Sequence, residues 1–219
     1  MYNYIGGIME KKLFIFDFDG TLVTEDILDV ICEIVGKKEE SKDINEKYMK
    51  GELTTLKDTL CARINFLKGI SSKEIKEKLD KENYLRKGTK KLFEYLKNNN
   101  FITILCSGNI TPVLNYYKDI LRIDYVFGTN PIMKNNQIDY IDETCFKSKD
   151  FKYELCKSII EELNIKNENI YAIGDSLADI KMLELAKHKF TVDPKGGIEN
   201  YADIIIKESL EEIIKYLKS

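Results

Sequence analysis

The feature that most constrains the fold is an apolar segment that ends abruptly in acid. Residues 13–16 are all apolar, and the motif Asp-Phe-Asp-Gly-Thr follows directly at residues 17–21. Continuous apolarity over a strand's length is typical of a parallel sheet that is buried on both faces. Ligands of open parallel sheets bind beyond the carboxyl ends of the strands. Asp17 and Asp19 are therefore predicted to lie where a ligand binds.

The same pattern recurs along the chain. Apolar runs of strand length occupy residues 101–106, 125–127, 170–173, 190–192 and 204–206. Helical patterns lie between them. Thr111 is a predicted N-cap because Pro112 follows it, and residues 151–163 carry apolar side chains at helical spacing. Strands that alternate with helices predict an α/β fold built on a doubly wound parallel sheet.

One region interrupts this alternation. Between residues 25 and 86 the patterns are helical, with apolar stripes that end at Gly36 and Gly69. Ser71 and Glu74 have the spacing of a capping box at the start of a further helix. We expect a core domain of residues 1–24 and 87–219, with residues 25–86 inserted after the first strand as a small all-helical cap domain.

Composition excludes several classes of protein. The 34 basic and 37 acidic residues give a net charge of -3, so nucleic acid is not an expected partner. No apolar stretch is long enough to span a membrane, and residues 1–10 do not resemble a signal peptide. Met9 is an alternative start to Met1, since the strong pattern begins at Lys11. The odd number of cysteines, without a CxxC pair, predicts reduced thiols and a cytoplasmic location; these are Cys32, Cys61, Cys106, Cys145 and Cys156.

Two further strand ends carry polar groups. Ser107, Gly108 and Asn109 follow the run at 101–106, and their hydroxyl and backbone N–H groups suit phosphate oxygens, although such residues are also common in turns. Asp175 and Asp179 follow the run at 170–173, where acids also favour a helix N-terminus. Clustered carboxylates repel one another unless a cation lies among them. A divalent cation with oxygen ligands, such as Mg²⁺, is the predicted cofactor.

What is missing from the sequence narrows the chemistry. His188 is the only histidine, which argues against a phosphohistidine enzyme or a two-histidine metal site. No cysteine has an arginine six positions later, so the loop of cysteine phosphatases is missing. A carboxylate nucleophile needs no activating base at neutral pH, which is consistent with this composition.

Taken together, the motifs resemble those of the haloacid dehalogenase superfamily. Residues 17–21 resemble its first motif, Ser107 its second and Gly174 to Asp179 its fourth. Lys152 matches the third motif, and it is chosen over neighbouring lysines by this resemblance alone. The resemblance extends from Lys12 to the C-terminal helix. The superfamily resemblance implies a Rossmann-like core. The helical insert is similar to the cap of the phosphoserine phosphatase-like subfamily.

The resemblance implies a mechanism. Asp17 would attack phosphorus and become an aspartyl phosphate, and Asp19 would protonate the leaving group and later deprotonate water. Mg²⁺ would be held by the Asp17 carboxylate, the Asp19 backbone carbonyl and Asp175, with Asp179 in support. The phosphoryl oxygens would be bound by Ser107, the N–H of Gly108 and Lys152.

The implied substrate is a small phosphate ester, with O-phospho-L-serine as the first expectation. Asp26 stands in the place of a cap glutamate that recognises an amino group, and Arg63 in that of an arginine that binds a carboxylate. A surface charge is the alternative for Arg63. The chain also departs from the subfamily at Gly20, Asn109 and Ala178. A different small phosphomonoester, a phosphotransferase and a silent binding module remain alternatives.

Overall fold

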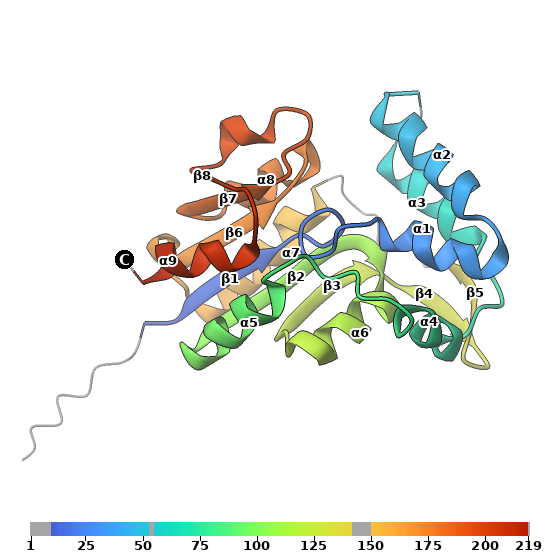
Figure 1. Cartoon of the computed structure of the whole chain (residues 1–219), viewed down its shortest axis with the longest axis horizontal. Helices are drawn as coiled ribbons and strands as arrows, with labels where there is room; N and C mark the ends of the chain where they lie inside the picture. The colour runs from blue at the N-terminus through green and yellow to red at the C-terminus, as the bar shows by residue number, and fades with distance from the viewer. Residues whose placement is uncertain (1–9, 53–54, 142–149, 219) are drawn as a thin grey trace, which may run out of the picture.

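A computed structural model describes residues 10–52, 55–141 and 150–218 of the chain. Its centre is a six-stranded sheet in the order β3-β2-β1-β6-β7-β8, and every neighbouring pair is parallel (Figure 1). The predicted doubly wound α/β fold is confirmed, and each of the six apolar runs forms one of these strands. The strands are β1 (Lys12–Phe16), β2 (Phe101–Ile110), β3 (Tyr125–Thr129), β6 (Ile170–Gly174), β7 (His188–Val192) and β8 (Ile204–Ile206).

Strand β1 lies in the middle of the sheet and contributes to both faces. Phe14 and Phe16 pack in one core cluster, which contains α5 (Thr89–Asn98) and α6 (Thr111–Leu121). Leu13 and Ile15 pack in a second cluster with α7 (Phe151–Leu163) and α8 (Ile180–Leu183). Alternate side chains of a strand point to opposite faces, so an all-apolar strand needs cover on both sides. Helix α9 (Ile213–Leu217) packs beside α5.

The segment between β1 and β2 is helical, as expected from its sequence. It contains α1 (Ile27–Cys32), α2 (Lys38–Met49), α3 (Leu56–Asn65) and α4 (Ser72–Leu79). Figure 1 shows α1, α2 and α3 grouped at one end of the sheet. The capping box of Ser71 and Glu74 is confirmed, and Gly36 caps a helical turn with a φ of 67°. The division into a core and a cap of residues 25–86 remains our proposal.

A short antiparallel hairpin was not predicted. It consists of β4 (Pro131–Lys134) and β5 (Gln137–Ile141), and the two asparagines between them, Asn135 and Asn136, both have positive φ. Asparagine tolerates this left-handed conformation, which a tight hairpin turn requires. The hairpin also contacts the helical segment, because the N–H of Gly69 donates to the carbonyl of Ile138 at 2.7 Å.

Two local predictions need correction. Strand β2 continues to Ile110 and so includes residues 107–109, which were expected to follow the end of the strand, with a register shift between Cys106 and Ile110. The predicted N-cap Thr111 is instead the first residue of α6, and Ile110 holds the cap position. Helix ends commonly shift by one residue in this way.

The structure describes four of the five cysteines. Cys32, Cys106 and Cys156 are free thiols, while Cys145 lies outside the described residues, as do both possible start residues. Within the described ranges, no helix has the length and apolarity to cross a membrane.

Candidate active site

Three adjacent strands bring the predicted residues together. Phe16 at the end of β1 pairs with Leu105 of β2 on one side and with Ile173 of β6 on the other. The residues that follow these positions therefore emerge at the same edge of the sheet. Strands β2 and β3 lie on one side of β1, and strands β6 to β8 lie on the other. The strand order therefore reverses direction at β1, and ligands of such sheets bind at this switch point.

An acidic cluster forms at this edge. Asp17, Asp175 and Asp179 are buried, and one carboxylate oxygen of each lies within 4.8 Å of the others. Burial, followed by the charge of Asp179, raises the pKa of Asp17 to about 7. Oδ2 of Asp17 is buried and has no hydrogen-bond partner among the described residues. The cluster therefore carries more negative charge than buried carboxylates tolerate alone.

Lys152 neutralises part of this charge. Its Nζ donates to Oδ1 of Asp17 at 2.6 Å and to Oδ1 of Asp179 at 2.7 Å. Burial opposes the charged form of Lys152, but the two carboxylates outweigh burial and hold its pKa well above the usual value. The first turn of α7 thus places a cation where a helix N-terminus disfavours one, which indicates that anions surround it.

The loop after β6 positions the last two acids. Oδ2 of Asp179 accepts hydrogen bonds from the backbone N–H groups of Asp175 and Ser176, both at 3.2 Å. A side chain at Gly174 would place its Cβ 2.5 Å from the Cβ of Asp179, so only glycine permits this approach. Asp179 therefore faces the cluster because it closes a capped turn, Leu177–Asp179, rather than by lying on a regular helix.

Asp19 points away from the acidic cluster. Its Oδ1 accepts from the N–H of Ile27 at 2.8 Å, and Nδ2 of Asn109 donates to both of its oxygens at 3.1 Å. Ser107 Oγ lies 3.3 Å from Oδ2 of Asp19. Burial, followed by the charge of Asp26, raises the pKa of Asp19 to about 8. A carboxyl group that holds its proton near neutral pH is suited to acid catalysis.

Ser107 and Gly108 lie between the acidic edge and the helical segment. The side chain of Ser107 is almost completely buried, and its Oγ accepts a hydrogen bond from the N–H of Asn109 at 3.0 Å. A Cβ built on Gly108 would lie 3.0 Å from Cδ1 of Leu60, a residue of α3. The helical segment therefore covers the backbone that is expected to bind phosphate.

The structure excludes the surface-charge alternative for Arg63. The arginine is 3% exposed, and its Nη2 donates to Oδ1 of Asp26 at 2.6 Å. Asp26 is also the N-cap of α1 and accepts hydrogen bonds from the N–H groups of Leu28 and Asp29. Both residues line a cavity of about 660 Å³ that extends to Asp17. The structure thus brings the predicted site residues to this one cavity, except Asp179, which joins the site through its contact with Lys152.

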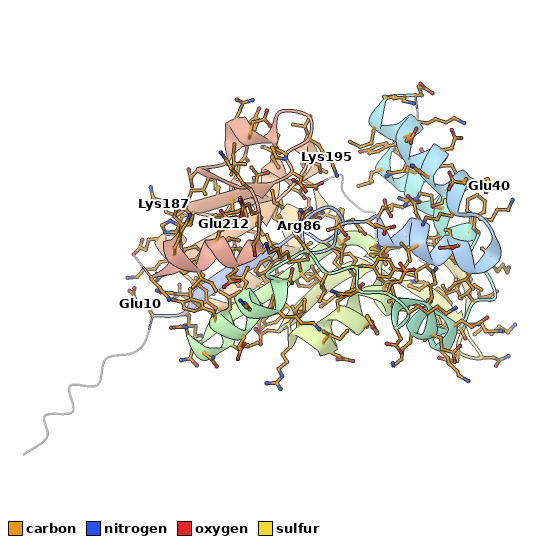
Figure 2. All side chains as sticks on the ribbon, in the orientation of Figure 1. Glu10, Glu40, Arg86, Lys187, Lys195 and Glu212 are labelled. Atoms are coloured by element: carbon orange, nitrogen blue, oxygen red, sulfur yellow. The ribbon has the colours of Figure 1, made fainter. Side chains whose placement is uncertain are left out.

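Residues that sequence reasoning missed also contact the site. Nζ of Lys195 donates to Oδ2 of Asp175 at 2.6 Å, and Arg86 donates to the backbone carbonyls of Gly20 and Thr21 (Figure 2). Gly20 has a φ of +83°, and a Cβ there would lie 2.2 Å from Oδ2 of Asp175. The sequence shows that Lys195 follows the apolar run at 190–192, but its proximity to Asp175 depends on the sheet order, in which β7 lies next to β6.

The family comparison decides what this arrangement belongs to. The model of haloacid dehalogenase-like hydrolases matches residues 14–184, which contain every residue of the acidic edge described above except Lys195. The chain belongs to the haloacid dehalogenase-like hydrolase family. Lys152, which sequence physics alone could not single out, lies at the acidic centre of this family member.

Individual proteins of the family are similar over almost their full length. The phosphoserine phosphatase of Methanocaldococcus jannaschii is 32% identical over 210 residues, which cover 95% of this chain and 99% of that protein. The phosphoserine phosphatase of Campylobacter jejuni subsp. doylei is 30% identical and covers 94% and 99%. A solved complex of phosphoserine phosphatase with substrate has a TM-score of 0.82 at 30% identity, covering 94% of this chain and 98% of that one. A phospho-aspartyl intermediate analogue of phosphoserine phosphatase has a TM-score of 0.81 at 30% identity, covering 94% and 99%.

Proposed function

We propose that the chain hydrolyses O-phospho-L-serine to serine and phosphate through an aspartyl phosphate on Asp17. One observation supports this above all: Asp17, Asp175 and Lys152 of the acidic cluster line the same cavity as Arg63 and Asp26. A phosphate group and a small zwitterion could occupy this cavity together. The similarity to phosphoserine phosphatases over nearly the whole chain supports the same substrate.

The acidic cluster fits a magnesium ion. Its donors are carboxylate oxygens, which hard divalent cations prefer, and the buried Oδ2 of Asp17 has no protein partner in the described part of the chain. Asp17, Asp175 and Asp179 would hold the ion with their side chains, and Asp19 with its backbone carbonyl. When bound, Mg²⁺ would neutralise carboxylate charge and polarise the phosphoryl oxygens.

The reaction that we propose has two steps at phosphorus. In the first step the Asp17 carboxylate attacks phosphorus, the bond to the serine oxygen breaks, and Asp19 donates its proton to that oxygen. In the second step Asp19 takes a proton from water, which attacks the aspartyl phosphate and releases inorganic phosphate. The raised pKa of Asp19 favours the protonated form that the first step needs.

The remaining residues stabilise the phosphoryl group. Ser107 donates through its hydroxyl, Gly108 through its backbone N–H, and Lys152 through its ammonium group. Lys152 also favours the charged form of Asp17 against burial and orients it, since it contacts Oδ1 and leaves Oδ2 without a partner among the described residues. A charged nucleophile held in one orientation lowers the barrier by positioning as well as by electrostatics.

A substrate panel tests this function. Phosphate release would be measured for L-phosphoserine, phosphoethanolamine, phosphoglycolate and sugar phosphates, with Mg²⁺ and with EDTA. We expect L-phosphoserine to have the highest kcat/KM and EDTA to abolish turnover. A higher kcat/KM for another ester would make that ester the substrate, and phosphoryl transfer to an added acceptor would indicate a transferase. The proposed setting is serine biosynthesis in the cytoplasm, and the free thiols of Cys32, Cys106 and Cys156 are consistent with it.

A further inference from the structure

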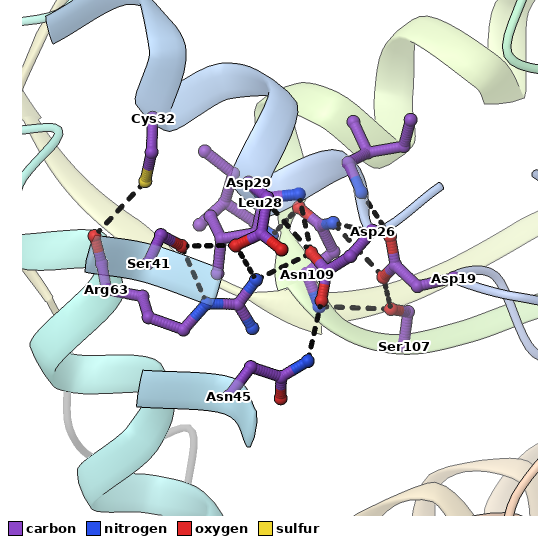
Figure 3. Close-up of polar contacts among 12 residues, drawn as sticks. Asp19, Asp26, Leu28, Asp29, Cys32, Ser41, Asn45, Arg63, Ser107 and Asn109 are labelled. Atoms are coloured by element: carbon purple, nitrogen blue, oxygen red, sulfur yellow. Dashed lines mark hydrogen bonds and ion pairs between the residues drawn. The ribbon is translucent and has the colours of Figure 1, made fainter. Parts of the chain in front are cut away.

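A second carboxylate lies behind Asp26. Asp29 is three residues further along α1 and is 8% exposed. Its Oδ1 accepts hydrogen bonds from Oγ of Ser41 at 2.5 Å and from Nη2 of Arg63 at 2.9 Å (Figure 3). Nε of Arg63 donates to the same Ser41 Oγ at 2.9 Å. Asp29 and Ser41 thus hold two nitrogens of the guanidinium group from α1 and α2.

This arrangement leaves one nitrogen of Arg63 for a ligand. Nη1 has no hydrogen-bond partner among the described residues, although the arginine is 97% removed from solvent. Arg63 also lines the cavity that reaches Asp17 and Ser107. Nη1 is not among the buried side-chain atoms that lack a partner, so this nitrogen is open to the cavity rather than enclosed in the protein. Nη1 is therefore the donor that a substrate carboxylate can reach.

Asp26 offers the complementary acceptor. Its Oδ1 already accepts from Leu28, Asp29 and Arg63, whereas its Oδ2 accepts from Nδ2 of Asn45 alone among the described residues, at 3.2 Å. Because Oδ2 accepts fewer hydrogen bonds than Oδ1, it has room for an ammonium group. The cavity thus presents one donor and one acceptor, as a zwitterion requires.

The charges of this group do not cancel. Two carboxylates, Asp26 and Asp29, face one guanidinium, so the formal net charge is negative by one unit. Ser41 and Asn45 are neutral. Lys42 and Glu46 also line the cavity, but both side chains are exposed, so water screens their charges. Because the two charges have opposite signs, their effects on a ligand in the cavity oppose each other. An ester that carries a carboxylate without an amine meets a repulsive field, and an ammonium group meets an attractive one.

We propose that Asp29 is the residue that sets charge selectivity: it positions Arg63 and makes the recognition group net negative, so the cap favours esters that carry an ammonium group. The proposal rests on the proposed function, because it concerns selection among small phosphate esters at the same site. Oδ1 of Asp29 is bound to Ser41 and Arg63. Asp29 acts through Arg63 and through its own charge.

Two esters separate this role from a structural one. O-phosphoethanolamine is phosphoserine without the carboxylate, and 3-phosphooxypropanoate is phosphoserine without the amine. Asp29→Asn keeps the size of the side chain and an oxygen acceptor for Ser41 and Arg63, but it removes the charge. We expect the ratio of kcat/KM for phosphoethanolamine to that for 3-phosphooxypropanoate to fall by about tenfold or more, as loss of a nearby, partly screened charge predicts.

The control is Asp43→Asn, the same change in an exposed i,i+4 pair with Lys47 on α2, and it should leave the ratio unchanged. An unchanged ratio in Asp29→Asn would overturn the proposal, because a general loss of folded enzyme lowers both rates equally.

The wild-type enzyme tests the proposed function separately. The proposed function is wrong if L-phosphoserine is not preferred to both analogues, whatever the ratio in the variant.

Ser41→Ala tests the positioning role without altering charge, and it keeps the proposal open to test if Asp29→Asn does not fold. Loss of the hydroxyl frees Nε of Arg63, so KM for L-phosphoserine should rise severalfold while kcat stays near the wild-type value. KM for phosphoethanolamine, which has no carboxylate for Arg63, should not change. Equal effects on the two substrates would contradict a positioning role for this hydrogen-bonded group.

Discussion

Two charged groups line the same cavity, and the protein satisfies them to different extents. At the sheet edge, Asp17, Asp175 and Asp179 share Lys152 and Lys195, yet a buried oxygen of Asp17 has no partner in the described chain. In the cap, the carboxylates of Asp26 and Asp29 accept hydrogen bonds from their own helix, from α2 and from Arg63.

The difference separates chemistry from selection. Buried like charges without compensation are unstable, so a cation at the sheet edge, as we propose, would complete this group. The cap group is already hydrogen-bonded, so it keeps its geometry before the substrate arrives, and preorganisation lowers the cost of binding. Changes at the sheet edge should therefore reduce kcat, whereas changes in the cap should alter preference among substrates.

The largest expected effect is at the nucleophile. Asp17→Asn should lower turnover of L-phosphoserine by at least about a thousandfold, because an amide does not attack phosphorus. The fold should be retained, since the change removes a charge from a crowded acidic cluster. Steady-state phosphate release and a thermal melt would measure both. A folded variant with near wild-type activity would show that Asp17 is not the nucleophile.

Lys152→Met should reduce kcat by about a hundredfold, because the phosphoryl group loses a cation and Asp17 loses its partner at 2.6 Å. Lys157→Met, on the same helix but in an exposed pair, is the matched control and should have little effect. If both lysine variants lowered kcat equally, Lys152 would have no role at the acidic edge beyond that of an exposed lysine.

A third effect concerns the pH dependence of stability without metal. Burial raises the pKa of Asp17 to about 7 in the folded protein, against an ordinary aspartate value of 3.8, so the folded state binds more protons between these pH values. Its contribution to stability is present below about pH 4 and is lost as pH rises towards 7. Relative to Asp17→Asn, the wild-type free energy of unfolding in EDTA should fall on the order of 2 kcal/mol over this window.

Urea denaturation of both proteins at several pH values would measure this difference, and Mg²⁺ should reduce it because a cation stabilises the charged carboxylate. If the wild-type protein instead became more stable relative to the variant as pH rose, the stability difference would change in the opposite direction. That result would mean that other groups of the protein already compensate the charge of Asp17.

The smallest effect is expected at Asn109, whose amide donates to both oxygens of Asp19. Asn109→Gly should lower kcat about tenfold with little change in KM, since the acid–base group loses its orientation. KM and kcat measured for L-phosphoserine would distinguish this from a binding defect. A rise in KM alone would place Asn109 with the cap group rather than with the chemistry.

The ease of prediction from sequence follows the same division. The strands and the acids after β1 and β6 were predictable because continuous apolarity and strand-end carboxylates are local patterns. Lys152 required a family resemblance, since nothing local distinguishes it from nearby lysines. The burial of Arg63 depends on Asp29 and Ser41, which come from two other helices, so no window of sequence contains it.

The hairpin β4–β5 shows another limit. Its strands are short and its turn is Asn135-Asn136, a weaker signal than an asparagine followed by glycine. Lys195 reaches Asp175 only because β7 lies next to β6, which is a property of sheet order and not of local sequence. These contacts are tertiary, and they decide how the site is completed.

The most direct measurement is a rapid acid quench of the wild-type enzyme during turnover of L-phosphoserine with Mg²⁺, followed by peptide mapping by mass spectrometry. We predict a phosphoryl group on Asp17 in the wild type and none in Asp17→Asn, which should also release no phosphate. A phosphoryl group on any other residue, or continued phosphate release by a folded Asp17→Asn protein, would contradict the account.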